Sequence, residues 1–150
     1  MKKLIYRIFC LSFLLFLSSC GSSDNQFELI GNADVSDGTM IYVLQADQNN
    51  QPYIKDSTSV QSNSFKFKGI SSTPQISYIQ VNGVNGYVLA ILENGDIKAD
   101  IYKDSISKSR VYGTKSNDDF IKYKAETKYL VDTMNNISSD AQSAIMNGDV

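Results

Sequence analysis

Histidine and tryptophan are absent from this 150-residue chain, and only two cysteines, Cys10 and Cys20, are present. Without histidine, the Ser-His-Asp arrangement and the common zinc sites are excluded. Cysteine nucleophiles and disulfides are also excluded from the mature domain, because no cysteine follows Cys20. We therefore expect a protein that is not an enzyme, with no catalytic residue, no cofactor site and no metal site.

The amino-terminal residues have the features of a secretion signal. Basic residues precede an almost unbroken apolar run at residues 8–17. Even counted from Leu4, the run covers about fourteen residues, short of the roughly twenty that a membrane-spanning helix needs. The Leu-Ser-Ser-Cys segment that ends at Cys20 resembles the lipobox of bacterial lipoproteins. This resemblance implies that residues 1–19 are a cleaved signal peptide and that Cys20 receives the lipid.

A lipid on Cys20 predicts a stable membrane anchor, because two or more acyl chains hold a protein on a bilayer. Residues 20–25 then form a lipidated tether, and at up to about 3.5 Å per residue they keep the domain within roughly 20 Å of the membrane. Gly21 rather than Asp follows the cysteine, which in enteric-type lipoproteins favours the outer membrane. We expect a cell-envelope protein anchored in the outer membrane and facing the periplasm.

Removal of the signal peptide makes the protein more acidic. Three of the 14 basic residues, Lys2, Lys3 and Arg7, leave with it, so 11 remain against 16 acidic residues, a net charge of minus five. An acidic surface repels phosphate backbones, so nucleic acid is not an expected partner.

Short strands separated by turn residues dominate the chain from residue 26 to residue 113. Phe65 and Phe67 alternate with lysines, which is the two-residue period of a half-buried strand, and Asn82-Gly83 and Asn94-Gly95 are typical turn pairs. We expect strands at residues 27–30, 40–46, 53–60, 65–69, 76–81, 87–92, 96–102 and 110–112, with 53–60 and 65–69 paired as a hairpin. The pattern predicts a mainly β fold, an antiparallel β-sandwich or barrel-like meander of about seven strands.

One amphipathic helix is expected in the last segment, residues 114–150. It begins near Ser116 or Asn117, and apolar residues then recur every three or four positions, among them Tyr123, Leu130 and Ile137. Two of the expected strands, 40–46 and 87–92, are apolar on both faces, so one face of their sheet needs a cover. We expect the helix to pack on that face; the alternative is a stem that projects toward a downstream domain or a second subunit, giving a homodimer through the C-terminal helix.

Three weaker patterns have ordinary structural explanations. Glu93 and Asp96 are close in sequence and would suit a pair of catalytic carboxylates, but a solvated hairpin tip is the preferred interpretation. The loop that starts at Asp47 has the spacing of a calcium loop, but Pro52 replaces the glycine that such a loop needs. The strand tyrosines (Tyr42, Tyr53, Tyr78, Tyr87, Tyr102 and Tyr112) would stack on a sugar or peptide, although strand tyrosines usually pack in the sheet.

Several short motifs resemble one known family. These are Phe-x-Leu-x-Gly at 27–31, Tyr-x-Leu at 42–44, Asp56-Ser57, Asn-x-Phe-x-Phe-x-Gly at 63–69 and Leu-Glu-Asn-Gly at 92–95. Together they resemble the β-rich domain of unknown function that precedes thioredoxin-like, AhpC/TSA-type domains in lipoproteins of gut-type two-membrane bacteria. In the same bacteria, Ser57, Ser105 and Thr133 would each fit an O-glycosylation pattern.

The resemblance implies a division of labour between domains. In that family the β-rich domain has no established catalytic residue, and the redox chemistry belongs to a Cys-x-x-Cys motif in the following domain, which this chain does not contain. We therefore expect a membrane-anchored envelope lipoprotein that is a non-catalytic accessory domain of a thioredoxin-like thiol-disulfide oxidoreductase. The alternative is a stand-alone lipoprotein that binds an envelope glycan or peptide.

Overall fold

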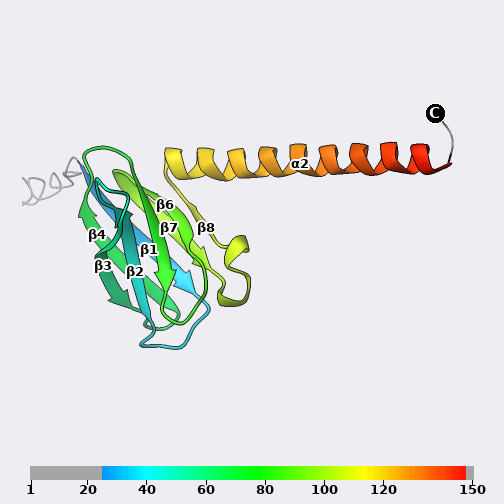
Figure 1. Cartoon of the computed structure of the whole chain (residues 1–150). Coiled ribbons are helices and arrows are strands. Elements are labelled where there is room, and N and C mark those ends of the chain that lie inside the picture. Colours follow the sequence, from blue (N-terminus) through cyan, green and yellow to red (C-terminus); the bar gives the residue numbers. More distant parts are fainter. Residues whose placement is uncertain (1–24, 148–150) are drawn as a thin grey trace, which may run out of the picture.

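The computed structural model describes residues 25–147, which form a β-sandwich followed by one long helix (Figure 1). The mainly β fold is confirmed, with eight strands in two sheets. The elements are β1 (Gln26–Ala33), β2 (Met40–Ala46), β3 (Pro52–Ser59), β4 (Ser64–Ile70), β5 (Gln75–Val81), β6 (Val88–Leu92), β7 (Gly95–Ile101), the 3₁₀ segment η2 (Lys103–Lys108), β8 (Arg110–Tyr112) and α2 (Lys115–Asn147).

The eight strands are divided equally between two layers. The β1 sheet has the order β4-β1-β7-β8, and the β2 sheet has the order β3-β2-β5-β6. All ladders are antiparallel except the one between β1 and β7, which is parallel. The chain therefore passes from one sheet to the other several times. The two strands expected to be apolar on both faces, β2 and β6, both belong to the β2 sheet. As expected for a strand of that composition, β2 is central, whereas β6 is an edge strand.

Alternation along each strand sends one set of side chains into a shared core. In β1, for example, Phe27, Leu29, Gly31 and Ala33 are buried while the residues that alternate with them are more exposed, which is the two-residue period of a half-buried strand. Within residues 25–147, every buried apolar side chain lies between Phe27 and Val111. The sandwich thus has a complete core without any contribution from α2.

Two phenylalanine–glycine pairs explain why the first and fourth strands carry matching motifs. In the ladder between β1 and β4, Phe27 lies opposite Gly69 and Phe65 lies opposite Gly31. A Cβ atom at Gly69 would stand 2.7 Å from Cε1 of Phe27, and one at Gly31 would overlap the ring of Phe65. Each ring therefore covers the backbone of the glycine across the ladder, an arrangement that only glycine permits.

The prediction that residues 53–60 and 65–69 pair as a hairpin is wrong, although the turn predicted between them is present. Ser62 and Asn63 both have positive φ, 51° and 60°, and Gln61 bridges to Ser64 across the turn. The strands on either side then separate: β3 pairs with β2, and β4 pairs with β1 in the other sheet. The reason is that β4 buries its two phenylalanines by pairing with β1, while β3 is almost entirely exposed and would bury neither.

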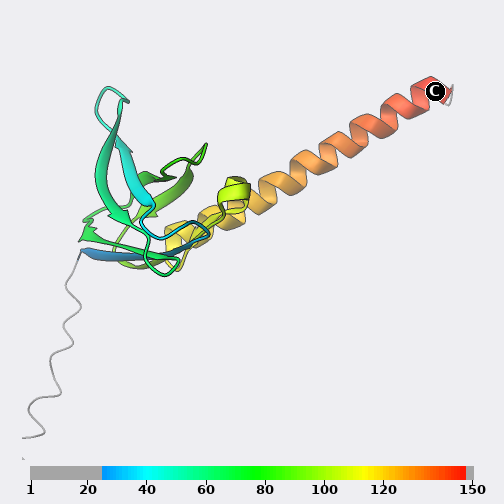
Figure 2. The same ribbon diagram turned by 90° about the horizontal axis from the view of Figure 1, so that it is seen from below.

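The expectation that the helix packs on the sandwich is also wrong. Helix α2 is continuous and extends away from the sandwich (Figures 1 and 2), and Asn117 is its one buried residue. The side chains of the expected packing stripe are exposed: Tyr123 by 62%, Leu130 by 61%, Met134 by 67% and Ile137 by 63%. Only the first turns of α2 contact the sandwich, at β6 and β8, so the helix axis leads away from the sheets instead of across them.

Candidate docking surfaces

The outer face of the β2 sheet carries a row of apolar side chains that crosses all four strands. The strand registers place Leu44 opposite Ile54 on one side and opposite Tyr78 on the other, and Tyr78 opposite Leu89. Their neighbours in sequence, such as Val43 and Ile79, point into the core. The row therefore faces outward, and Ile54 is 58% exposed.

Further apolar residues extend this row into a surface. Ile76 lies opposite Ile91 in the next register position and is 62% exposed, and the ring of Tyr87 meets that of Tyr78 edge to face with centroids 5.8 Å apart. We call this surface the apolar face; it comprises Tyr42, Leu44, Ile54, Ile76, Tyr78, Tyr87, Leu89 and Ile91. None of these positions is charged. Large exposed apolar surfaces of this kind are typical of sites where another molecule binds.

The outer face of the β1 sheet is charged instead. Glu28 forms ion pairs with Lys66 and Lys68 on β4. At the other edge of the sheet, Nη2 of Arg110 on β8 lies 3.0 Å from Oδ2 of Asp100. The ion pair with Lys66 outweighs partial desolvation and lowers the pKa of Glu28 below its usual value, and Asp100 raises the pKa of Arg110. Each of these charges is therefore already compensated by an opposite charge across the ladder.

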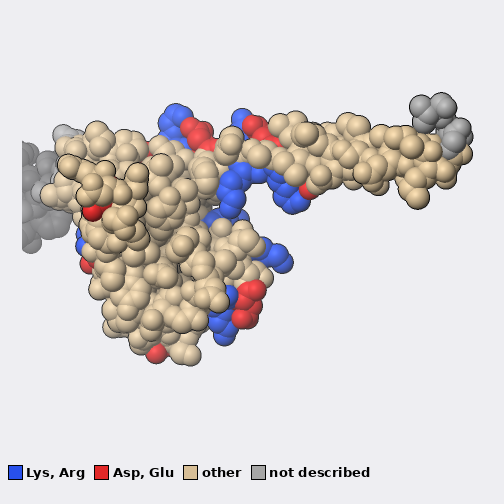
Figure 3. All heavy atoms as spheres, viewed as in Figure 1, with Lys and Arg blue, Asp and Glu red and all other residues tan. Residues whose placement is uncertain are grey.

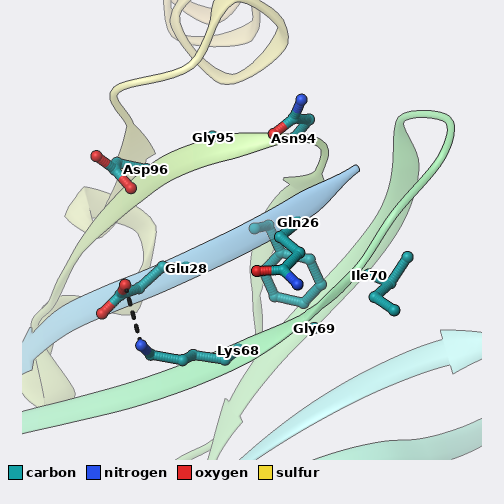
Figure 4. A pocket seen from close by; sticks show the side chains of 9 residues that line it. Gln26, Glu28, Lys68, Gly69, Ile70, Asn94, Gly95 and Asp96 are labelled. Carbon is teal, nitrogen blue, oxygen red and sulfur yellow. Dashed lines mark ion pairs between the residues drawn. The ribbon is translucent and has the colours of Figure 1, made fainter. Parts of the chain in front are cut away.

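A shallow hollow of about 610 Å³ lies at one end of this charged face, as shown in Figure 4. Glu28 and Lys68 line one side, and Asn94 and Asp96 lie across β1 from Lys68. The hollow combines matched charges with an open surface, so its residues lack the buried, convergent polar groups that a small-molecule site usually has.

The side chain of Asn117 makes the first of two contacts that fix the base of α2 to the edge of the β2 sheet. The Asn117 side chain accepts a hydrogen bond from the Ile91 N–H at 2.9 Å and donates one to the Ile91 carbonyl at 2.8 Å, so its amide replaces a neighbouring strand. It also donates to the Thr114 hydroxyl at 2.7 Å. The free edge of β6 is thereby covered, which prevents pairing with another chain at this position.

Glu93 makes the second contact at the base of the helix. Its carboxylate accepts hydrogen bonds from the Ser116 N–H at 2.8 Å and from the Ser116 hydroxyl at 2.7 Å. Partial burial acts to raise its pKa, but hydrogen bonds from Ser116 and Thr114 and the charge of Lys115 outweigh that effect, so the pKa lies below its usual value. A carboxylate at this end of a helix also interacts favourably with the helix dipole.

The structure assigns Glu93 and Asp96 to different surroundings, and the interpretation of a solvated hairpin tip is wrong. Glu93 binds the helix, and Asp96 lines the hollow on the β1 sheet. The two residues do not form a solvated hairpin tip, because the strands on either side of them, β6 and β7, belong to different sheets. The helix start is also different from the expected one: α2 begins at Lys115, so Asn117 lies inside the helix and binds β6 instead of capping.

The remaining sequence-predicted residues fall in several places. Cys20 lies outside residues 25–147. The Asp47 carboxylate accepts hydrogen bonds from the backbone N–H groups of Asn49 and Gln51, both at 2.8 Å, so it stabilises its own loop. Among the residues that the structure describes, no cluster of three or more acidic, histidine or cysteine side chains has the arrangement of a metal site.

The tyrosines and the glycosylation motifs are scattered over the sandwich and the helix. Three tyrosines belong to the apolar face, whereas Tyr53 donates a hydrogen bond to Gln45 and Tyr112 lies beneath Arg110. Ser57 is exposed on β3, Ser105 is half-buried in η2, and the Thr133 hydroxyl donates to the Tyr129 carbonyl within α2. Glycosylation of these three residues stays a prediction.

A polar network inside the β2 sheet was not predicted from the sequence. The Gln45 amide, nearly buried, donates to the Ser77 hydroxyl at 2.9 Å and to Gln75 at 3.1 Å, and Lys55 also donates to Gln75. Its members come from three strands, so no local sequence pattern predicts the network. Within the described range, every buried side-chain nitrogen and oxygen has a hydrogen-bond partner.

Comparison with known proteins agrees with the expected domain type. Within residues 25–147, no helix has both the length and the apolarity needed to cross a membrane. No curated protein and no solved structure is significantly similar to the chain. The sequence profile of one family matches residues 27–120, which include all of the sandwich except Gln26 and extend into the first turns of α2. The chain therefore belongs to the family described as "Domain of unknown function (DUF4369)".

Proposed function

We propose that this protein is a membrane-anchored lipoprotein of the cell envelope whose sandwich is a non-catalytic accessory module for a thioredoxin-like oxidoreductase. The lipobox-like segment before Cys20 supports the anchor, and the short motifs at Phe27–Gly31 and Asn63–Gly69 support the association. The apolar face is the structural observation that carries the proposal. It is an exposed, uncharged surface on a rigid sheet, and it suits a protein partner with an apolar patch of its own.

The position of the start of β1 suits a module that is anchored through its amino terminus. Phe27 at the start of β1 pairs with Gly95, two residues after Glu93, which binds the base of α2. The start of β1 therefore lies at the same end of the sandwich from which α2 leaves (Figure 1). With 33 residues at about 1.5 Å each, α2 spans about 50 Å, so it extends well beyond the sandwich.

The anchor is tested by replacing Cys20, with Cys10 as the matched control. In cells that process lipoproteins, the wild-type chain and Cys10→Ala should incorporate labelled palmitate and fractionate with outer membranes. Cys20→Ala should remain an unlabelled precursor. Equal labelling of Cys20→Ala and Cys10→Ala would contradict the lipoprotein proposal.

The docking role is tested with two isoleucines from opposite faces of the sandwich. Ile76→Asp places a charge on the apolar face, and Ile30→Asp places one on the charged face, at a residue that is also exposed. Binding to a purified thioredoxin-like oxidoreductase from the same envelope should weaken at least tenfold for Ile76→Asp and stay within twofold for Ile30→Asp. Equal binding by both variants would contradict a role for the apolar face.

Binding of a glycan or a peptide is the second candidate, and the edge-to-face pair of Tyr78 and Tyr87 favours it. Exposed aromatic rings offer stacking surfaces to sugars and to apolar side chains. Titration of envelope oligosaccharides and short peptides against the wild-type chain and Tyr87→Ala separates this candidate from the first. Saturable binding that Tyr87→Ala abolishes, with no binding to the oxidoreductase, would favour the second candidate.

A further inference from the structure

Helix α2 carries a regular repeat that the sandwich does not use. Apolar and small residues alternate at intervals of three and four positions along almost its whole length: Phe120, Tyr123, Thr127, Leu130, Met134, Ile137, Ala141 and Ala144. A repeat with a mean spacing of 3.5 residues is the pattern of a left-handed coiled coil, in which these positions form the seam between helices. We propose that two copies of this chain pair through α2 as a parallel two-stranded coiled coil.

The seam is free to take a partner. From Lys122 onward nearly every residue of α2 is exposed, and the four large seam residues Tyr123, Leu130, Met134 and Ile137 are all more than 60% exposed. In a single copy most of this stripe remains in water, because the core of the sandwich is filled by residues of the strands and the loops between them. Pairing with an identical stripe removes the seam from water without any change in the sandwich.

The direction of the seam leaves room for a second helix. Asn117 points toward the sandwich, where it binds Ile91. At about 100° per residue, Tyr123 lies about 120° around the helix from Asn117, and Leu130, one heptad later, lies on the same side. A partner helix along this side therefore avoids the sandwich of the first copy.

Charges beside the seam favour the parallel orientation. In a parallel pair, Asp119 of one copy lies next to Lys124 of the other, and the symmetry of the dimer produces this attractive contact twice. In a fully overlapped antiparallel pair, Glu126 would lie next to Asp140 of the other copy, which is repulsive and would also occur twice. As Figure 3 shows, the charged side chains of α2 gather in its first half, near the sandwich, where the attractive contacts would form.

The composition of the seam limits its strength. Thr127, Ala141 and Ala144 bury little apolar area, so most of the affinity must come from Leu130, Met134, Ile137 and the aromatic residues. The dimer is therefore expected to dissociate on dilution. The pairing depends on α2 alone and not on lipidation or on an oxidoreductase partner.

Sedimentation equilibrium of the full chain in density-matched detergent micelles tests the pairing. Wild-type protein should approach two copies per particle as its concentration rises. Leu130→Asp should raise the dimer dissociation constant at least tenfold. Tyr129→Asp, which introduces the same charge at the neighbouring exposed residue off the seam, should change it less than threefold. One copy per particle at all concentrations, or equal effects of the two variants, would overturn the proposal.

Cross-linking tests the orientation without disturbing the fold. Because Cys10 and Cys20 are already present, yields are compared with those of the parent chain. A cysteine at Ile137 should cross-link to the same position in the second copy, whereas one at Tyr129 should not. Efficient linking between Ile137→Cys and Thr127→Cys chains, without linking of Ile137→Cys to itself, would show an antiparallel pair and overturn the parallel arrangement.

Discussion

The sandwich and helix α2 differ in how far their apolar side chains are buried. The sandwich buries one set of apolar side chains, among them Leu29, Ile41 and Ile79, between its two sheets, and it pairs opposite charges on the outer face of its β1 sheet. Helix α2 buries only Asn117 and exposes most of its large apolar residues. The sandwich therefore has a complete core in one copy, whereas the helix has none. Both the helix and the apolar face of the β2 sheet present a surface that suits another molecule. Substitutions at matched positions in the two regions test this difference.

The largest effect is expected for leucine-to-alanine changes made once in each region. Leu29 is fully buried in β1, so Leu29→Ala should lower the free energy of unfolding by about 3 to 5 kcal/mol through lost burial and a residual cavity. Leu130 is exposed in α2, so Leu130→Ala should change the unfolding of the sandwich by less than about 0.5 kcal/mol. Urea unfolding followed by near-ultraviolet tyrosine signals measures both. A comparable loss in Leu130→Ala would mean that the helix contributes to the core after all.

The next effect concerns the junction between the two regions. Asn117→Ala removes three hydrogen bonds and leaves the Ile91 N–H and carbonyl without their partner, so it should destabilise the protein by about 2 to 3 kcal/mol. Asn136→Ala makes the same change at an exposed position of α2 and serves as the control. Thermal unfolding of the two variants, compared with wild type, measures the difference. If Asn117→Ala were as stable as Asn136→Ala, the contact with β6 would have no role in fixing the helix.

A smaller, pH-dependent effect is expected at Glu93. Its pKa is lowered in the folded state, so its carboxylate stabilises the protein above the ordinary value of 4.5, and this contribution disappears as the pH falls through the folded-state pKa. Glu93→Gln should cost about 1 kcal/mol at pH 7 and flatten the decrease in stability below pH 4.5. Glu28 has a lowered pKa as well, so part of the decrease should remain. The measurement is the free energy of unfolding between pH 7 and pH 3, with Glu126→Gln as a control that should keep the wild-type profile.

The smallest effect is expected for removal of most of the helix. Truncation after Lys122 keeps the contacts of Glu93 and Asn117, so the melting temperature of the sandwich should change by less than about 2 °C. Truncation after Gly113 removes these contacts and should lower it clearly. Equal melting temperatures for the two truncations would show that the base of the helix does not stabilise the sandwich.

Strand positions were largely predictable because they depend on local patterns. The stretches around residues 40–46 and 110–112 match β2 and β8 in full, and the other strands differ by a few residues at their ends. Turn residues with positive φ, such as Asn63 and Gly83, stand where the chain reverses. Partner choice was not predictable in the same way. The pairing of β4 with β1, and not with β3, depends on the phenylalanine–glycine contacts across a ladder that joins distant parts of the chain.

The candidate surfaces show the same limit. The sequence correctly predicted that β2 and β6 are apolar on both faces, but assigned α2 as their cover. Two contacts hold α2 in a different position, those of Asn117 with Ile91 and of Glu93 with Ser116. The residues of each pair are far apart in sequence. They fix the first turns of α2 at a sheet edge, so the apolar face and the helical seam both stay exposed.

The sequence by itself therefore determined the mainly β class, the strand and helix segments and the spacing of the apolar residues along α2. Each of these depends on residues that are neighbours in the chain, where side-chain alternation and turn preferences act directly. The tertiary structure alone decided which strands share a sheet, that one ladder is parallel, and that α2 leaves the sandwich. These features arise from contacts between residues far apart in sequence, whose free energy appears only once the two sheets have come together.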